Sequence, residues 1–151
     1  MEKQQFNFKT TVRVRTYEVD WQGIVHNTVY LLYCEIGRVE YLNHIGADLD
    51  LNRVNSTNRV VLSRNEIDYK SPARSNMEID VYTRIAEIGN SSFIFEGMLR
   101  NADTGVLIAE NRAFHVWLNS TASHSIAVPE DFRTIVRKHE KGNLKEILQK
   151  P

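Results

Sequence analysis

The chain opens with an alternation of apolar and polar positions. In residues 8–17 β-branched side chains recur at every second position, which predicts a strand. The alternation stops in residues 18–28, a segment that holds Asp20, Gly23 and Asn27. These residue types favour turns and helix starts, so we expect the chain to change direction there.

Residues 29–45 show the three- and four-residue spacing that is typical of a helix. One apolar stripe consists of Val29, Leu32, Ile36, Val39 and Leu42, and a second of Tyr30, Tyr33, Gly37, Tyr41 and His44. Two stripes indicate a helix that other elements cover on most of its circumference. Because Gly37 costs the helix about 1 kcal/mol relative to Ala, we interpret it as a point of close backbone approach. Asn27 or Thr28 is the expected N-cap, and Gly46 the expected end.

Four further strands are predicted after a polar loop over residues 47–58. Their ranges are 59–69, 78–88, 92–100 and 106–118. Turn signals at 89–90 and 103–105 predict short connections, and Pro129 opens a final helix that we expect to continue through the Lys/Glu-rich tail. Successive short turns favour an antiparallel meander. The sequence therefore predicts an α+β fold in which a curled antiparallel sheet wraps one long central helix and leaves sheet edges for a partner subunit.

Composition narrows the class of protein. The 151 residues fit a single domain over 1–151, with a core at about 10–136 and a helical tail after it. Lys+Arg and Asp+Glu are 19 each, and this zero net charge argues against a general nucleic-acid binder. No apolar run is long enough for a membrane span. The first ten residues lack the apolar stretch of a secretory signal, so we expect a cytoplasmic protein.

The single cysteine, Cys34, excludes an internal disulfide and a zinc site built on several cysteines. We expect Cys34 to fill space in the core, and His115 to be a hydrogen-bonded histidine of the last strand. No metal site or cofactor is suggested by the residues.

Three segments carry a resemblance to a known family. Residues 15–41, RTYEVDWQGIVHNTVYLLYCEIGRVEY, place Asp20, Gly23 and Tyr30 in order before and within the first helical turn. Residues 66–81, EIDYKSPARSNMEIDV, contain an I-x-Y-x-x-P strand end, and residues 87–95, EIGNSSFIF, contain a turn with paired serines. In this order and spacing they resemble the hotdog-fold acyl-CoA thioesterases of the 4-hydroxybenzoyl-CoA thioesterase-like family, over residues 10–136.

The resemblance implies hydrolysis of an acyl-CoA thioester without a cofactor. Asp20 would act as nucleophile or general base, and the backbone N–H of Asn27 would stabilise the oxyanion. Gly23 would let the backbone approach the acyl group, and Trp21 would shield the neighbouring carboxylate from water. The family also implies a homodimer or homotetramer, with sites between two subunits.

Several roles stay open at the level of sequence. His26 stands one residue before the position where some family members carry a histidine, so it is either a substrate contact or a surface turn residue. Tyr30 either packs in the core or lines the acyl slot, and Glu35 is either a paired helix residue or helps to position water. Candidates for contact with the CoA nucleotide are Arg74, Asn90, Ser91 and Ser92, together with Arg64, Lys70 and Arg84.

The rival functions are an acyl-carrier-protein thioesterase, a dehydratase and a non-catalytic acyl-binding module. A dehydratase of this fold needs a histidine and an acid paired across the dimer, and the position of His26 argues against that arrangement. The presence of Asp20 argues against a non-catalytic acyl-binding module.

Overall fold

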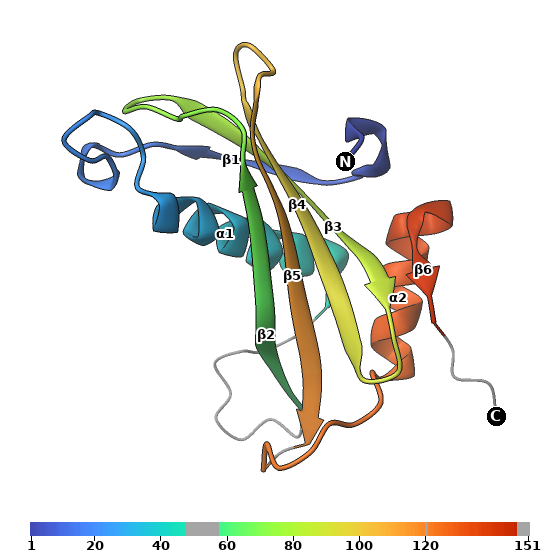
Figure 1. The fold of residues 1–151 in the computed structure, drawn as a ribbon. Coiled ribbons are helices and arrows are strands. Elements are labelled where there is room, and N and C mark those ends of the chain that lie inside the picture. Colours follow the sequence, from blue (N-terminus) through green and yellow to red (C-terminus); the bar gives the residue numbers. More distant parts are fainter. Residues whose placement is uncertain (48–57, 120, 148–151) are drawn as a thin grey trace.

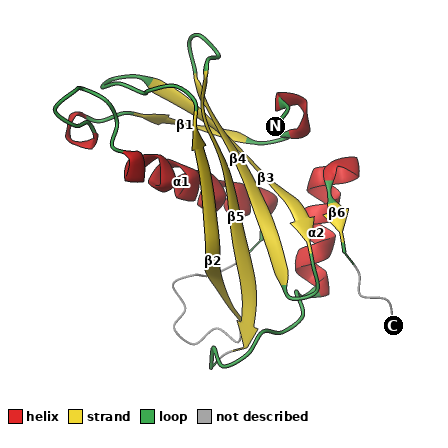
Figure 2. Ribbon diagram, in the orientation of Figure 1, coloured by secondary structure: helices red, strands yellow, loops and turns green. Residues whose placement is uncertain are grey.

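The computed structural model describes residues 1–47, 58–119 and 121–147 (Figure 1). Its strands and α-helices are β1 (Lys9–Arg13), α1 (Asn27–Ile45), β2 (Asn58–Tyr69), β3 (Glu78–Ile88), β4 (Ser92–Asn101), β5 (Leu107–Asn119), α2 (Glu130–Glu140) and β6 (Lys145–Glu146). Single turns of 3-10 helix are η1 (Lys3–Gln5), η2 (Thr16–Glu18) and η3 (Lys141–Asn143). Figure 2 shows α1 lying across one face of a curled sheet, as expected, and α2 near one end of it.

The strand order in the sheet is β1-β3-β4-β5-β2, and β6 pairs in parallel with the end of β3. The predicted hairpins β3–β4 and β4–β5 are confirmed, but the predicted meander is wrong at β2, which pairs with β5 rather than with β3. The connection over residues 70–77 contains Pro72 and is too long for a tight hairpin, so the chain crosses to the other side of the sheet. Consequently β2 forms one edge of the sheet, and β1 and β6 lie along the other.

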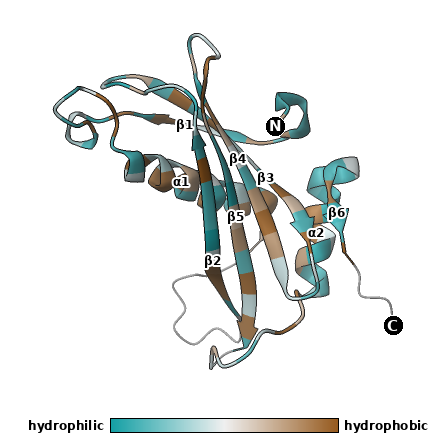
Figure 3. Cartoon of the chain, viewed as in Figure 1, coloured by the Kyte–Doolittle hydropathy of each residue, from teal (hydrophilic) through white to brown (hydrophobic). Residues whose placement is uncertain are grey.

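Gly37 sets the distance between α1 and the sheet. A Cβ atom added there would lie 2.5 Å from Thr83 Oγ1 and 2.7 Å from Val81 Cγ1, both on β3. The predicted close approach is therefore confirmed, although the neighbouring atoms belong to side chains. Hydrophobic and hydrophilic residues occur along every long strand (Figure 3), and β3 is the most completely buried, with nine of its eleven positions buried.

The expectation that α1 is covered on most of its surface is wrong for one stripe. Leu32 is 54% exposed and Val39 39% exposed, with Ile36 partly buried between them. The second stripe is buried against the sheet through Tyr30, Tyr33, Gly37 and Tyr41. Within the described residues, one sheet covers only one side of a helix, so the outer apolar stripe is exposed at Leu32 and Val39, while its other members are buried or partly buried.

The ends of α1 differ slightly from expectation. The N-cap is His26 rather than Asn27 or Thr28, and its side chain forms no capping hydrogen bond. Gly46 ends the helix as predicted, with φ of +72°, and its N–H donates to the carbonyls of Leu42 and Asn43. This left-handed conformation is one that glycine adopts without steric cost.

Two other predicted elements are too long. The first strand ends at Arg13 instead of residue 17, because residues 16–18 turn into η2. The final helix ends at Glu140 and does not continue through the tail: Lys141 has φ of +54°, and residues 145–146 form β6 against β3. α2 docks on the sheet through Phe132 and Val136, which are buried.

Candidate functional site

The predicted turn around Asp20 is a tight hairpin closed by a bridge between Val19 and Val25. The Asp20 N–H donates to the Ile24 carbonyl at 2.8 Å, and the Gly23 N–H donates to the Asp20 carbonyl at 2.9 Å. Gly23 has φ of +71°. Asp20 and Gly23 therefore fit a three-residue hairpin loop with glycine at its left-handed position.

One oxygen of the Asp20 carboxylate is used by the hairpin itself. Oδ1 accepts the N–H groups of Gln22 at 2.8 Å and Ile24 at 3.1 Å. Among the residues that the structure describes, Oδ2 has no hydrogen-bond donor, and the residue is partly exposed. The loop thus fixes the carboxylate by one oxygen and leaves the other available to a further group.

Trp21 does not shield this carboxylate, so that expectation is wrong for a single chain. Its side chain is 92% exposed, and the nearby Tyr17 is 75% exposed. Trp21 occupies the first loop position, beyond the last backbone pair of the hairpin, where no element of the described chain packs on it. Two large aromatic side chains close to Asp20 in the sequence are therefore exposed.

The hairpin leads directly into the first turn of α1. The His26 N–H donates to the Glu18 carbonyl at 3.0 Å, and the His26 side chain is exposed. Asn27 is the first helical residue, and within the described ranges its N–H has no acceptor, in keeping with the geometry of helix starts. The Tyr69 hydroxyl, at the end of β2, donates to the Asn27 carbonyl at 2.8 Å and so fixes this turn.

Tyr30 lies in the core beneath this turn. Its buried hydroxyl accepts the Ala73 N–H at 3.0 Å, and its ring centroid lies 5.4 Å from that of Tyr69. Burial raises the pKa of the Tyr30 phenol, so it stays protonated at neutral pH. These contacts favour the packing interpretation, while a role in the acyl slot stays a prediction.

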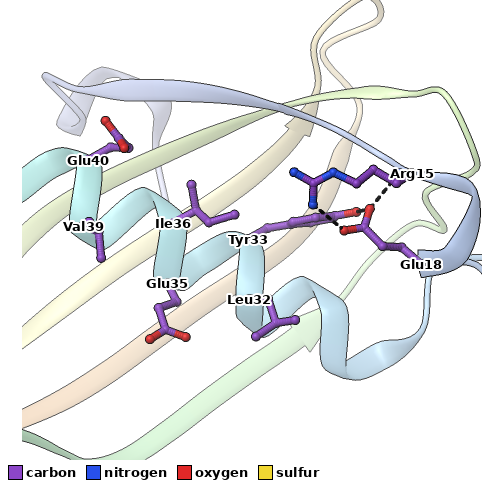
Figure 4. Close-up of a pocket in the computed structure, with 8 residues that line it drawn as sticks. All are labelled: Arg15, Glu18, Leu32, Tyr33, Glu35, Ile36, Val39 and Glu40. Carbon is purple, nitrogen blue, oxygen red and sulfur yellow. Dashed lines mark hydrogen bonds and ion pairs between the residues drawn. The ribbon is translucent and has the colours of Figure 1, made fainter.

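Sequence reasoning missed Glu18, the most buried carboxylate near Asp20, with 7% of its surface exposed. Oε2 accepts the Tyr33 hydroxyl at 2.7 Å and the Arg15 N–H at 2.7 Å, and Oε1 lies 3.0 Å from the Arg15 guanidinium (Figure 4). Burial alone would raise the pKa of Glu18, but these hydrogen bonds and the Arg15 charge hold it below its ordinary value. The three-residue spacing of Arg15 and Glu18 is the signal that could have revealed the pair.

A groove of about 420 Å³ runs along the exposed side of α1, next to this ion pair. Figure 4 shows its lining: Arg15, Glu18, Leu32, Tyr33, Glu35, Ile36, Val39 and Glu40. Glu35 is exposed on the groove, and no ion pair of the described residues includes it. Its suggested role in positioning water stays a prediction.

The candidates for contact with the CoA nucleotide lie at opposite ends of β3. Arg74 is exposed and forms a backbone bridge with Ile24, beside the Asp20 hairpin. Asn90, Ser91 and Ser92 form the β3–β4 turn at the far end, roughly 30 Å away for a strand of eleven residues. A single chain does not bring these two groups together.

Arg84 is not available for a nucleotide, so the expectation for this residue is wrong. It is buried in an ion pair with Glu96, with Nη2 at 2.7 Å from the carboxylate, and its Nη1–H donates to the Asn143 carbonyl at 3.0 Å.

Cys34 is a buried core residue and His115 is a hydrogen-bonded, partly buried histidine of β5, as predicted. Burial raises the pKa of the Cys34 thiol to about 12, so it is unreactive at neutral pH. Burial, with a smaller contribution from the Arg38 charge, lowers the pKa of His115 to about 4. His115 is therefore neutral, stacked on Phe93, with Nδ1 at 3.2 Å from the Ala113 carbonyl.

The described part of the chain holds no membrane-spanning helix and no cluster of metal ligands. None of its helices is long and apolar enough to cross a bilayer. None of its histidine, cysteine, aspartate and glutamate side chains gather in groups of three or more that could hold a metal ion.

Two curated thioesterases are similar to this chain in sequence. The chain is 29% identical to the acyl-acyl carrier protein thioesterase ATL3 of Arabidopsis thaliana over 82% of its own length. That match spans 64% of ATL3, which is less than two thirds of the plant protein. The chain is 27% identical to the acyl-CoA thioester hydrolase YbgC of Escherichia coli, over 66% of the chain and 74% of YbgC.

A solved structure and a family profile that match this chain are also of thioesterases. A thioesterase from Thermus thermophilus, crystallised with coenzyme A and Zn, is 28% identical with a TM-score of 0.78, and the match covers 91% of this chain and 96% of that one. The sequence profile of the thioesterase-like superfamily matches residues 14–136. The stretch includes the Asp20 hairpin, α1 and the strands β2 to β5, which confirms the resemblance seen in the sequence. The chain therefore belongs to the thioesterase-like superfamily.

Proposed function

We propose that this protein hydrolyses acyl thioesters, with Asp20 as the reacting carboxylate. The observation that carries the proposal is the hairpin joined to the start of α1, in a chain of the thioesterase-like superfamily. Its backbone holds one oxygen of Asp20, and the hairpin leads to a helix whose first N–H has no acceptor in the described residues. A base and an oxyanion donor are the two groups that thioester hydrolysis requires of a protein.

The reaction consumes one water and breaks the C–S bond of the thioester. The carbonyl oxygen takes negative charge as the tetrahedral intermediate forms, and the Asn27 N–H and the helix dipole stabilise that charge. The thiolate leaves and is protonated, and the acid is released as its carboxylate. In this scheme Gly23, His26 and Tyr30 surround the acyl group.

Two routes for Asp20 lead to the same products. As a general base, Asp20 takes a proton from the attacking water. As a nucleophile, it forms an acyl-aspartyl anhydride that water then cleaves. Label found in Asp20 after a single turnover in H₂¹⁸O identifies the nucleophilic route, because cleavage of the anhydride at the aspartyl carbonyl puts it there, whereas the base route puts the label only in the released acid.

We propose CoA thioesters as the substrates, on the strength of the resemblance to YbgC and to the Thermus thioesterase with bound coenzyme A. Exposed Arg74 and the residues Asn90, Ser91 and Ser92 are the proposed contacts for the nucleotide. Acyl-carrier-protein thioesters are the second candidate, because ATL3 bears that activity in its name. Parallel assays with one acyl chain on both carriers decide between them.

We also propose that the protein works as a homodimer, and that dimers can pair into a tetramer. β2 is a twelve-residue edge strand with exposed Val61 and Leu62, and β5 is its partner in the described sheet. Pairing of two such edges satisfies the open backbone groups. Because Arg74 and the β3–β4 turn are far apart in one chain, a partner subunit is the means of placing both near one CoA. Light scattering on the purified protein gives the oligomeric state.

The deciding experiment is a thiol-release assay on a panel of acyl-CoA thioesters with the parent and Asp20→Asn. We expect kcat to fall at least a hundredfold, because the amide keeps the hairpin hydrogen bonds but is neither a base nor a nucleophile. Asp103→Asn, on the exposed β4–β5 turn, is the matched control and should retain full activity. Activity retained in Asp20→Asn would remove Asp20 from the mechanism.

A further inference from the structure

Glu18 links the Asp20 hairpin to the chain before it and to α1. It is the last residue of η2, and its side chain accepts hydrogen bonds from Arg15, at the end of the β1 segment, and from Tyr33, in the second turn of α1. Its main-chain carbonyl accepts the N–H of the N-cap residue His26 at 3.0 Å. Figure 4 shows the Glu18 carboxylate between the Arg15 and Tyr33 side chains.

These contacts constrain both ends of the hairpin at once. The loop from Val19 to Val25 starts at the residue after Glu18 and ends at the residue before His26. The bond from His26 therefore closes the loop, and the bond from Tyr33 attaches the closed loop to the body of α1. Asp20 has no contact of its own with α1 among the described hydrogen bonds, so its placement relative to the first helical amides depends on what anchors the hairpin. Glu18 is one anchor, and Ala73, which accepts the Val25 N–H and donates to the Tyr30 hydroxyl, is the other.

We infer that Glu18 is a positioning residue for the hydrolysis proposed above: through Tyr33 and His26 it sets the distance between Asp20 and the first amides of α1. The inference rests on the proposed function, in which Asp20 and the Asn27 N–H act on the same thioester. Displacement of a reacting group by about 1 Å can cost a hundredfold in rate. Loss of the Glu18 contacts should consequently slow the chemical step more than it weakens substrate binding.

The opposite end of α1 provides a matched control. Tyr41 donates to the buried carboxylate of Glu140 at 2.5 Å, which is again a tyrosine on α1 bonded to a glutamate of another element. Tyr33→Phe and Tyr41→Phe each delete one hydroxyl and one buried hydrogen bond from the same helix. A merely structural role for Glu18 predicts similar consequences from both variants.

The test compares kcat, KM and the thermal midpoint of the two variants in the full-length protein. We expect both midpoints to fall by a few degrees, kcat of Tyr33→Phe to fall tenfold or more with KM within twofold, and kcat of Tyr41→Phe to stay within twofold of the parent. Glu18→Gln should recover part of the rate that Glu18→Ala loses, because the amide oxygen still accepts the Tyr33 hydroxyl. Equal kcat in Tyr33→Phe, Tyr41→Phe and the parent would overturn the inference.

Amide hydrogen exchange tests the same link without substrate. In Glu18→Ala we expect the His26 amide and the amides of the following helical turn to exchange at least tenfold faster, and the amides around Gly46 to keep the parent rate. Glu140→Ala should show the reverse pattern. If the parent cleaves no thioester, the proposed function fails. Unchanged exchange at His26 in Glu18→Ala would overturn the positioning role independently of activity.

Discussion

The two ends of α1 are each attached to the rest of the fold by a tyrosine hydroxyl that donates to a glutamate carboxylate. At the N-terminal end Tyr33 meets Glu18, and at the C-terminal end Tyr41 meets Glu140 on α2. The two bonds join the same pair of chemical groups, and both carboxylates are buried. They differ in what else surrounds each carboxylate.

Glu18 has a cation of its own. Besides Tyr33, it accepts the N–H and the guanidinium of Arg15, and its pKa lies below the ordinary value despite burial. Arg15 is more than half exposed, so the charge pair keeps contact with solvent on one side. Glu18 is therefore ionised throughout the physiological range.

Within the described part of the chain, Glu140 has no ion-pair partner. Burial raises the pKa of its carboxyl, and the hydrogen bonds from Tyr41 and the Ile85 N–H offset this only in part. Arg84 is near, but its guanidinium is bonded to Glu96 and to the Asn143 carbonyl. The comparison shows that the same type of hydrogen bond accompanies a lowered carboxyl pKa at Glu18 and a raised one at Glu140, depending on whether a cation bonds the carboxylate.

The largest difference in stability should come from truncating the two glutamates. Glu140→Ala leaves the Tyr41 hydroxyl and the Ile85 N–H unpaired in the core and should lower the free energy of unfolding by about 3 kcal/mol. Glu18→Ala should cost less, since the exposed Arg15 side chain can be hydrated. Urea unfolding of both variants measures the difference, and an equal or larger loss for Glu18→Ala would contradict this view of the two ends.

A second prediction concerns Gly37, midway between the two attachments. Gly37→Ala adds a methyl group against the stiff side chains of Thr83 and Val81, and should lower the free energy of unfolding by about 1–2 kcal/mol in spite of the better helix propensity of alanine. Asn43→Ala, at an exposed position of the same helix, is the control and should be neutral or slightly stabilising. A stabilised Gly37→Ala would mean that helix and sheet can separate without cost.

The smallest effects should appear in the pH dependence of stability, with opposite signs at the two ends. A carboxyl whose pKa is lowered on folding contributes stability above its ordinary value of 4.5, and this is lost as the pH falls through the folded value. A carboxyl whose pKa is raised contributes stability below 4.5, and this is lost as the pH rises through the folded value.

Unfolding measured from pH 4 to pH 8 checks these signs. Relative to the parent, Glu140→Gln should gain stability as the pH rises above 4.5, because the variant has no charge to bury. Glu18→Gln should lose most at neutral pH, with the deficit shrinking as the pH falls below 4.5. If the free energy of unfolding of the two variants, relative to the parent, changed with pH in the same direction, the two carboxyl pKa values would not be shifted in opposite directions.

Local residue patterns were sufficient for most elements. The three- and four-residue spacing predicted α1, Gly46 predicted its end, and the turn residues predicted the hairpins between β3, β4 and β5. The spacing of Asp20 and Gly23 predicted the turn before α1, and the resemblance carried by residues 15–41 indicated the family. Each of these features depends on contacts between residues near one another in the chain, so the sequence encodes them directly.

Other features of the structure depend on which segments, far apart in the sequence, pack against one another. The pairing of β2 with β5, the return of the tail as β6 beside β3, and the exposed stripe of Leu32 and Val39 follow from the arrangement of whole elements. The same holds for Glu18, whose importance is visible only once Tyr33 and Arg15 converge on it. The sequence by itself determined the local elements and the candidate carboxylate, because period and turn chemistry are local. Only the tertiary structure decided the partners, burial and charge state of that region, because these arise from long-range packing.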